Sequence, residues 1–230
     1  MTARKLIIAI DGPAGAGKST IASRLARKLG YVNIETGAMY RALALKAIEN
    51  DIGFDDEKAL MELADRSHID LQPTLEGNRV LLDKMDVTMR IRERDVTEAA
   101  SVVSTHPAVR AWMVARQRQM GAGGGIVMEG RDIGTKVFPD ADLKIFLDAA
   151  PEVRGDRRFR QQTTPTAPPA AVIAEMRERD QRDRTRANSP LVPAADAVVI
   201  DSTNLNIEQV MKRVEELVEE KLGEKRAAQS

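Results

Sequence analysis

The 230-residue sequence contains no cysteine, which excludes disulfide bonds, thiolate zinc sites and cysteine nucleophiles. Aromatic residues make up only 3% of the chain, which weakens the case for a stacking platform that binds single-stranded nucleic acid. No stretch reaches the roughly 18 apolar residues of a membrane helix, and the apolar run near the amino end is too short for a signal peptide. We therefore expect a cytoplasmic protein with no membrane partner.

The sequence also lacks an excess of either charge, since 35 Lys and Arg residues balance 35 Asp and Glu residues. General nucleic-acid binders usually carry a strong basic excess, so the balance argues against a nucleic-acid partner but leaves room for a local basic site. Hydrophobic residues make up 43% of the chain, which is ordinary for a globular protein and excludes disorder over most of it. The length predicts a single domain, with room for a modest insert.

Short apolar runs alternate with helical patterns along the chain. Runs typical of strands buried on both faces occur at residues 6–10, 31–34, 126–128, 143–147 and 197–200. Helical patterns cover residues 18–29, 39–48, 55–66, 93–104, 107–119, 151–161, 170–186 and 207–222. Strand followed by helix, repeated about five times, predicts an α/β fold: a five-stranded parallel sheet with helices on both faces.

Two stretches depart from this alternation. Residues 63–90 predict a small antiparallel insert, with short strands at 69–71 and 79–82 around the turn Glu76-Gly77-Asn78. Residues 163–169 contain three prolines and predict a loop that serves as a lid.

The segment Gly12-Pro13-Ala14-Gly15-Ala16-Gly17-Lys18-Ser19 matches the pattern G-x-x-x-x-G-K-[ST]. It follows a predicted strand and opens a predicted helix, as a phosphate-binding P-loop does. Glycines allow the tight turn that converges backbone N–H groups on an anion, and the helix directs its N-terminus at the phosphates. In such a loop Lys18 reaches the β- and γ-phosphates and the Ser19 hydroxyl is placed for Mg²⁺. The motif predicts a P-loop NTPase fold, Mg²⁺ as cofactor, and an ATP site formed by Gly12, Pro13, Ala14, Gly15, Ala16, Gly17, Lys18, Ser19 and Thr20.

A phosphate loop serves small-molecule kinases, but also NTPase switches and assembly factors. Residues 151–190 hold nine arginines and no lysine, a bias that favours bidentate phosphate contacts and so a kinase. Arg154, Arg157 and Arg158 follow the fourth predicted strand, at the sheet edge where ligands of α/β folds bind, and we expect them to be functional. A solvated helix face with ion pairs explains Arg182 and Arg184 at least as well. The alternative is a switch whose arginines serve a protein or RNA partner.

From end to end, the sequence resembles the bacterial-type cytidylate (CMP) kinases, within the nucleoside monophosphate kinases. Besides the phosphate loop, the resemblance is carried by Thr36-Gly37-Ala38-Met39-Tyr40-Arg41, Gly130-Arg131-Asp132-Ile133-Gly134-Thr135, Val137-Phe138-Pro139-Asp140-Ala141, Lys144-Ile145-Phe146-Leu147-Asp148-Ala149, Arg179-Asp180-Gln181-Arg182-Asp183-Arg184 and Ser189-Pro190-Leu191. It implies transfer of the ATP γ-phosphoryl group to CMP or dCMP, giving CDP or dCDP, in pyrimidine nucleotide metabolism. It also implies a monophosphate-binding part at 36–105, which includes the insert, and a lid at 151–175.

The resemblance implies roles for individual residues. The acceptor phosphate is held by Arg41, Arg131 and Arg179. Charge on the transferring group is stabilised by Lys18, Mg²⁺ and the lid arginines Arg157 and Arg158, and Arg131 is also counted as catalytic. The base contacts Asp132, Arg110 and Ser101, the ribose contacts Asp183, and Arg186 lies near the phosphate. Thr36 stands where many relatives have serine, and its hydroxyl is expected to cap the next helix and touch the acceptor.

Uracil presents an acceptor where cytosine presents the N4 donor, so Asp132 predicts poor activity with UMP. We expect a monomer. If the protein is a kinase, the alternative is a kinase that acts on another small acceptor, such as UMP or AMP.

Overall fold

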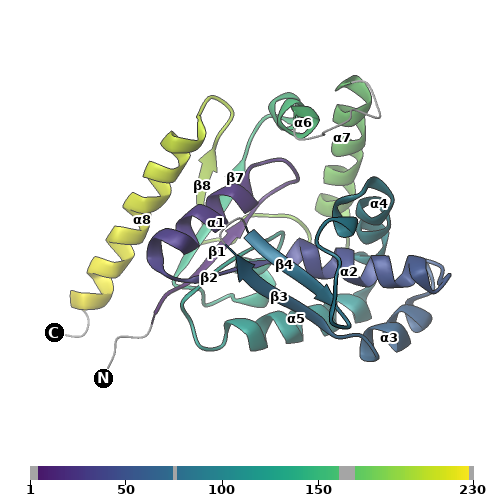
Figure 1. Cartoon of the computed structure of the whole chain (residues 1–230). Coiled ribbons are helices and arrows are strands. Elements are labelled where there is room, and N and C mark those ends of the chain that lie inside the picture. Colours follow the sequence, from purple (N-terminus) through teal and green to yellow (C-terminus); the bar gives the residue numbers. More distant parts are fainter. Residues whose placement is uncertain (1–4, 75–76, 161–168, 228–230) are drawn as a thin grey trace.

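The computed structural model describes residues 5–74, 77–160 and 169–227. Its centre is a five-stranded, wholly parallel sheet in the order β2-β6-β1-β7-β8 (Figure 1). The strands are β1 (Ile7–Asp11), β2 (Val32–Glu35), β6 (Ile126–Gly130), β7 (Leu143–Asp148) and β8 (Val198–Asp201). Every residue of β1 and β6 is buried, as their continuous apolar runs require of central parallel strands. The predicted five-stranded parallel sheet is confirmed.

Helices cover both faces of the sheet and divide the core in two. On one face, α1 (Lys18–Leu29) and α8 (Ile207–Ala227) pack on the side chains of Ile8, Ile10 and Ile145. On the other face, a second core gathers α2 (Thr36–Glu49), α3 (Glu57–Asp65), α4 (Arg94–Val103) and α5 (Pro107–Gly121). Alternate residues of β1 feed the two cores, because successive strand side chains point to opposite faces.

The predicted antiparallel insert is also present, next to α2 (Figure 1). It consists of β3 (Ile69–Thr74), β4 (Gly77–Leu82) and a third strand that the sequence did not reveal, β5 (Met85–Asp86). Asp83 and Lys84 join β4 to β5 with positive φ angles of 51° and 72°, which is the backbone of a tight hairpin turn. Val80 and Leu82 bury their side chains in the same core as α2.

The carboxyl-terminal half differs in detail from the prediction. Helices α6 (Pro151–Arg160) and α7 (Pro169–Thr185) match the predicted helical patterns, but the loop expected at 163–169 lies outside the described residues up to 168. A short 3₁₀ turn, η1 (Arg90–Arg92), and a π-turn, η2 (Ile133–Val137), have no sequence signature and were not predicted. Within the described ranges, no helix is long and apolar enough to cross a membrane.

Candidate functional site

The phosphate loop joins the end of β1 to the start of α1. Its glycines Gly12, Gly15 and Gly17 have positive φ angles of 145°, 74° and 99°. At Gly12 a Cβ atom would lie 2.0 Å from the backbone oxygen of Leu147 on β7, so only glycine fits. The predicted loop therefore has the backbone that an anion-binding turn requires, directly before a helix N-terminus.

Lys18 is buried within this loop, and its Nζ donates to the backbone oxygen of Pro13 at 2.7 Å. Burial and the positive charge of Arg131 lower the pKa of Lys18 to about 7. A bound polyphosphate would reverse this shift, because an opposite charge within a few ångströms favours the charged form of the amine.

Glu129, at the end of β6, is a site residue that the sequence analysis missed. The hydroxyl of Ser19 donates to its Oε1 at 2.6 Å. Burial, followed by the negative charge of Glu35, raises the pKa of Glu129. A buried carboxylate beside a hydroxyl gives the oxygen donors that Mg²⁺ prefers, so these two residues fit the predicted cofactor. The signal was available: an acid that ends a buried apolar run next to the phosphate-loop strand.

Beside the loop lie Arg41 of α2, Arg158 of α6, Arg179 of α7 and Arg131, which follows β6. The pKa of Arg179 is lowered to about 10, first by burial and then by the positive charge of Arg131, with Arg41 and Arg158 adding to the effect. Their acidic partners are few: Arg131 Nε donates to Asp183 Oδ2 at 3.0 Å, and Arg41 pairs with Glu35.

Three of these arginines have hydrogen-bonding groups to spare. The Nε atoms of Arg41 and Arg179 are buried and find no acceptor in the described part of the chain. Arg158 makes no hydrogen bond or ion pair with residues in the described ranges. Clustered guanidinium groups with too few carboxylates are suited to binding phosphate.

A second group of polar side chains lies between α2, α4, α5 and η2. Arg110 and Asp132 form a buried ion pair, with the Arg110 guanidinium 5.7 Å from the ring centroid of Tyr40. Within the described residues, Ser101 Oγ, Arg110 Nε and Arg186 Nη2 are buried without a hydrogen-bond partner. Buried polar atoms are nearly always satisfied, so three open ones in one region indicate a polar ligand.

Asp183 links the two groups. Its carboxylate accepts from Arg131, and Arg186 Nη1 lies 3.6 Å from its Oδ1. Burial alone would raise the pKa of Asp183, but the charges of Arg131, Arg179 and Arg186 outweigh it and hold the pKa below its usual value. The structure therefore brings together the predicted residues Arg41, Ser101, Arg110, Arg131, Asp132, Arg179, Asp183 and Arg186.

Thr36 does not cap the helix as expected. It is the first residue of α2, and Glu35 occupies the capping position. The Thr36 hydroxyl instead donates to the backbone oxygen of Glu129 at 2.8 Å. The capping prediction was wrong because β2 runs directly into α2, and the hydroxyl ties α2 to β6 beside the phosphate loop.

The lid arginines divide into two kinds. Arg154 is buried and pairs with Asp180 at 2.6 Å, while also donating to the backbone oxygens of Ala149 and Ala14. Arg157 donates to the hydroxyl and the backbone oxygen of Ser202 at 3.0 and 2.7 Å. Both thus hold α6 against neighbouring loops, whereas Arg158 lies close enough to Arg41 for that charge to lower its pKa, after burial.

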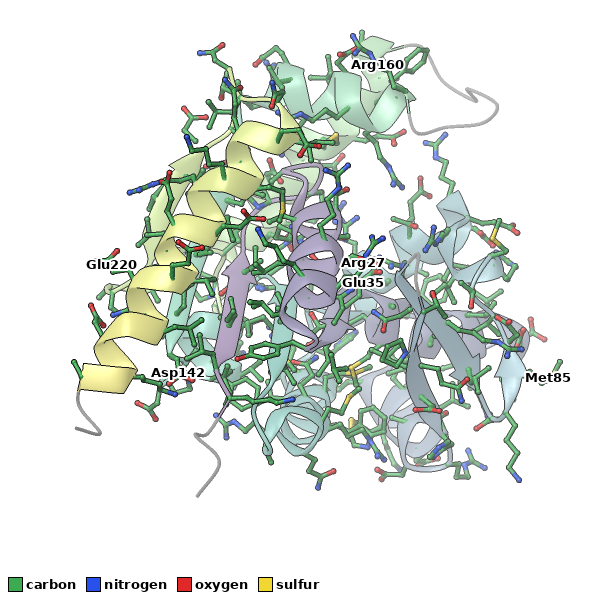
Figure 2. All side chains as sticks on the ribbon, turned by 60° about the vertical axis from the view of Figure 1, so that its left-hand side comes forward. Arg27, Glu35, Met85, Asp142, Arg160 and Glu220 are labelled. Atoms are coloured by element: carbon green, nitrogen blue, oxygen red, sulfur yellow. The ribbon has the colours of Figure 1, made fainter. Side chains whose placement is uncertain are left out.

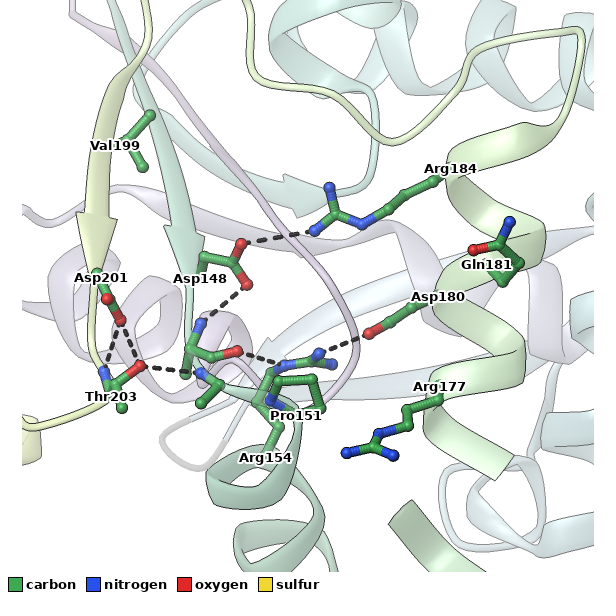
Figure 3. A pocket seen from close by; sticks show the side chains of 12 residues that line it. Asp148, Pro151, Arg154, Arg177, Asp180, Gln181, Arg184, Val199, Asp201 and Thr203 are labelled. Carbon is green, nitrogen blue, oxygen red and sulfur yellow. Dashed lines mark hydrogen bonds and ion pairs between the residues drawn. The ribbon is translucent and has the colours of Figure 1, made fainter. Parts of the chain in front are cut away.

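A pocket of about 730 Å³ lies elsewhere, at the carboxyl ends of β7 and β8 against α7 (Figure 3). Its charged walls are largely paired, Arg154 with Asp180 and Arg184 with Asp148 at 3.5 Å. This pairing supports the ion-pair interpretation of Arg184. Of the residues expected to be functional, only Arg154 is among those that line this pocket, and its charge is already paired with Asp180.

Comparison with known proteins finds one family model and several similar chains. A family model described as Cytidylate kinase matches residues 8–220. The chain is 48% identical to the Cytidylate kinase of Geobacillus kaustophilus (strain HTA426) over 222 residues, which are 96% of this chain and 99% of that protein. It is 50% identical to the Cytidylate kinase of Pelotomaculum thermopropionicum over 210 residues, 90% of this chain and 93% of that protein. Among solved structures, an uncharacterized protein from Eubacterium ventriosum ATCC 27560 has a TM-score of 0.52 at 11% identity, covering 94% of this chain and 99% of that one, which supports the fold alone.

Proposed function

Because the chain belongs to the cytidylate kinase family, we propose that the arginine-rich site at the carboxyl ends of β1 and β6 carries out the family's phosphoryl transfer, on dCMP as well as CMP. The chain is an ATP-dependent phosphotransferase that converts CMP to CDP. The observation that carries the site assignment is the arginine cluster with too few carboxylates, directly beside the phosphate loop.

The ATP side of the proposed site is the loop from Gly12 to Thr20. Its backbone N–H groups surround the β- and γ-phosphates, and Lys18 leaves the Pro13 oxygen to bind them. Ser19 and Glu129 would hold Mg²⁺, which when bound neutralises charge on the phosphate oxygens.

The acceptor phosphate is bound by Arg41, Arg131 and Arg179. Two anionic phosphates must approach in line, and these cations offset the repulsion between them. An ionised oxygen of the CMP phosphate forms a bond to the γ-phosphorus while the bond to the β–γ bridging oxygen breaks, and ADP leaves. This oxygen is already a nucleophile, so no general base is needed.

Charge on the transferring group is stabilised by Lys18, Arg131 and the lid arginines Arg157 and Arg158. Arg158 is the better placed of the two lid residues, since it is free to turn and lies near Arg41, whereas Arg157 would first leave Ser202. In water-excluded sites, a single such group typically contributes about 3–4 kcal/mol to transition-state binding.

The base is read by Asp132, Arg110 and Ser101. Cytosine offers a donor at N4 and acceptors at N3 and O2, which match a carboxylate and the open donors Ser101 Oγ and Arg110 Nε. Asp183 accepts from the ribose, and Arg186 supports the phosphate side. Uracil would present its O4 acceptor to Asp132 and is disfavoured.

The proposal also covers the closure of the enzyme around its substrates, its partners and its location in the cell. Parts 36–105 and 151–175 close over the two nucleotides and exclude water, which suppresses hydrolysis of ATP. The partners are ATP and CMP or dCMP, without nucleic acid or membrane, and the enzyme works as a cytoplasmic monomer.

The deciding experiment is coupled ADP release with Mg-ATP and a panel of CMP, dCMP, UMP, AMP and GMP. We expect release that depends on CMP or dCMP and is weak with UMP, and loss of release in Lys18→Ala with an unchanged circular dichroism spectrum. Activity with a purine, or with UMP alone, would overturn the base-site assignment. Slow ATP hydrolysis at a rate that does not change with any of these acceptors would instead favour an NTPase switch.

A further inference from the structure

Asp11 is a buried acid that no step of the proposed transfer uses. It is the last residue of β1, directly before Gly12, and only 5% of it is exposed. Its two carboxylate oxygens accept the backbone N–H groups of Ile133 and Gly134, at 2.8 and 2.7 Å. No salt bridge within the described part of the chain reaches this carboxylate, so both oxygens serve a single segment 122 residues away in sequence.

That segment carries the residue proposed to read the base. Asp132 precedes Ile133, and the backbone then enters the π-turn η2, in which Val137 and Phe138 donate to the oxygens five residues earlier. Such turns are rare and recur at functional sites. Asp132 is the residue directly before this turn, so the position of the peptide that follows it bears on where its side chain points.

The Asp11 carboxylate is suited to this task. It accepts hydrogen bonds from the backbone N–H groups of Ile133 and Gly134, the two residues that follow Asp132. The peptide after Asp132 therefore has little freedom to rotate. The backbone of Gly134 also packs closely against its neighbours. A Cβ atom at this position would lie 3.1 Å from Lys144 Cδ and 3.4 Å from Asp11 Oδ2. Asp132 in turn holds Arg110, another base-reading residue.

We infer that Asp11 is a positioning residue for base selection: it fixes Asp132 and Arg110 relative to the phosphate loop and so contributes to the preference for CMP over UMP. The inference rests on the proposed function of Asp132. It assigns the acid that precedes the phosphate loop to the acceptor side of the site rather than to ATP.

The test is Asp11→Asn, which keeps the size of the side chain but turns one acceptor oxygen into an NH₂ group. That group would face a backbone N–H, so one of the two hydrogen bonds is lost. We expect the CMP-to-UMP ratio of kcat/KM to fall about tenfold and KM for CMP to rise by a similar factor. KM for ATP should rise less than KM for CMP, since the phosphate-loop backbone is unchanged and only the charge that Asp11 contributes near Lys18 is lost.

Asp142→Asn is the matched control. Asp142 Oδ2 accepts the N–H of Ile7 at 2.7 Å, so it makes the same kind of contact at the other end of β1. Figure 2 shows Asp142 at the opposite end of the molecule from Arg160 on α6. The control should keep the CMP-to-UMP ratio, and an equal loss of ratio in both variants would mean that Asp11 acts only through general stability.

A raised KM for ATP with an unchanged CMP-to-UMP ratio in Asp11→Asn would overturn the inference, because Asp11 would then serve the phosphate loop. Failure of the proposed function is distinguishable, since wild-type protein would itself fail to discriminate CMP from UMP. If Asp11→Asn does not fold, hydrogen exchange of wild-type protein decides. CMP should slow exchange of the Ile133 and Gly134 amides more than UMP does, and equal protection would contradict the inference.

Discussion

Arg154 and Arg157 on α6 carry the same side chain as Arg131 and Arg179 beside the phosphate loop, but the two pairs differ in their partners. Arg154 and Arg157 use their N–H groups on Asp180, Ser202 and nearby backbone oxygens. Arg131 and Arg179 crowd together, and like charge combined with burial lowers the pKa of Arg179 to about 10. Arginines whose N–H groups are all hydrogen-bonded stabilise the fold. Arginines that lie close together with unused N–H groups are suited to binding an anion. Four predictions test this contrast, from the largest expected effect to the smallest.

The largest effect is expected on stability, from Arg154→Met. This change strands Asp180 in a buried position without its cation, and breaking a buried pair typically costs about 3–5 kcal/mol. Denaturant unfolding measures the loss. Arg177→Met is the control, since the pair of Arg177 with Glu152 is exposed and is expected to contribute little to stability. Equal losses of unfolding free energy in the two variants would contradict the structural role of Arg154.

The opposite behaviour is expected from Arg179→Met, which removes one cation from the crowded cluster. We expect kcat/KM for CMP to fall by about a hundredfold to a thousandfold. The free energy of unfolding should not fall, because repulsion from Arg131 is relieved. Arg182→Met, an exposed position on the same helix, should leave both quantities unchanged. A drop in stability without a drop in rate would place Arg179 with the structural arginines.

A smaller change is expected in specificity when the base-reading pair is broken. Asp132→Ala removes the acceptor for the cytosine N4 donor, so the CMP-to-UMP ratio of kcat/KM should fall by about tenfold or more. Steady-state kinetics with both acceptors measure it. Asp140→Ala, an exposed acid beyond η2, should keep the wild-type ratio. An unchanged ratio in Asp132→Ala would remove this residue from base recognition.

The smallest effect concerns pH. Three arginines hold the folded-state pKa of Asp183 below its usual value, so its stabilising contribution is complete above about pH 4 and is lost as the pH falls through the folded-state pKa. In Asp183→Asn, the free energy of unfolding should therefore depend less steeply on pH below about pH 4. Denaturant titrations across that range check the slope, and an identical slope in both proteins would contradict the assignment.

Local patterns were sufficient for the sheet and the phosphate loop. Apolar runs mark buried strands, and the glycine spacing from Gly12 to Gly17 fixes a turn regardless of what surrounds it. The antiparallel insert was found from a turn signal between two short runs. These features depend on neighbours in sequence, which is why sequence alone could predict them.

The division among the arginines could not be predicted in the same way. Arg157 and Arg158 are adjacent, yet one is held by Ser202, 45 residues further along, and the other is free of partners in the described ranges. Asp11 was missed for the same reason, since its partners Ile133 and Gly134 lie more than 100 residues away. Only the fold decides which charge meets which partner.

The strand order also determines when this protein can first work. In the central sheet β1 pairs with β6 and β7, so the strand that carries the phosphate loop has no neighbour until residues beyond 126 exist. At ribosomal speeds this delay is about 10 s. During synthesis, the phosphate loop is therefore made early but gains its final surroundings late, because both neighbours of β1, including Leu147 of β7 against which Gly12 packs, follow residue 125.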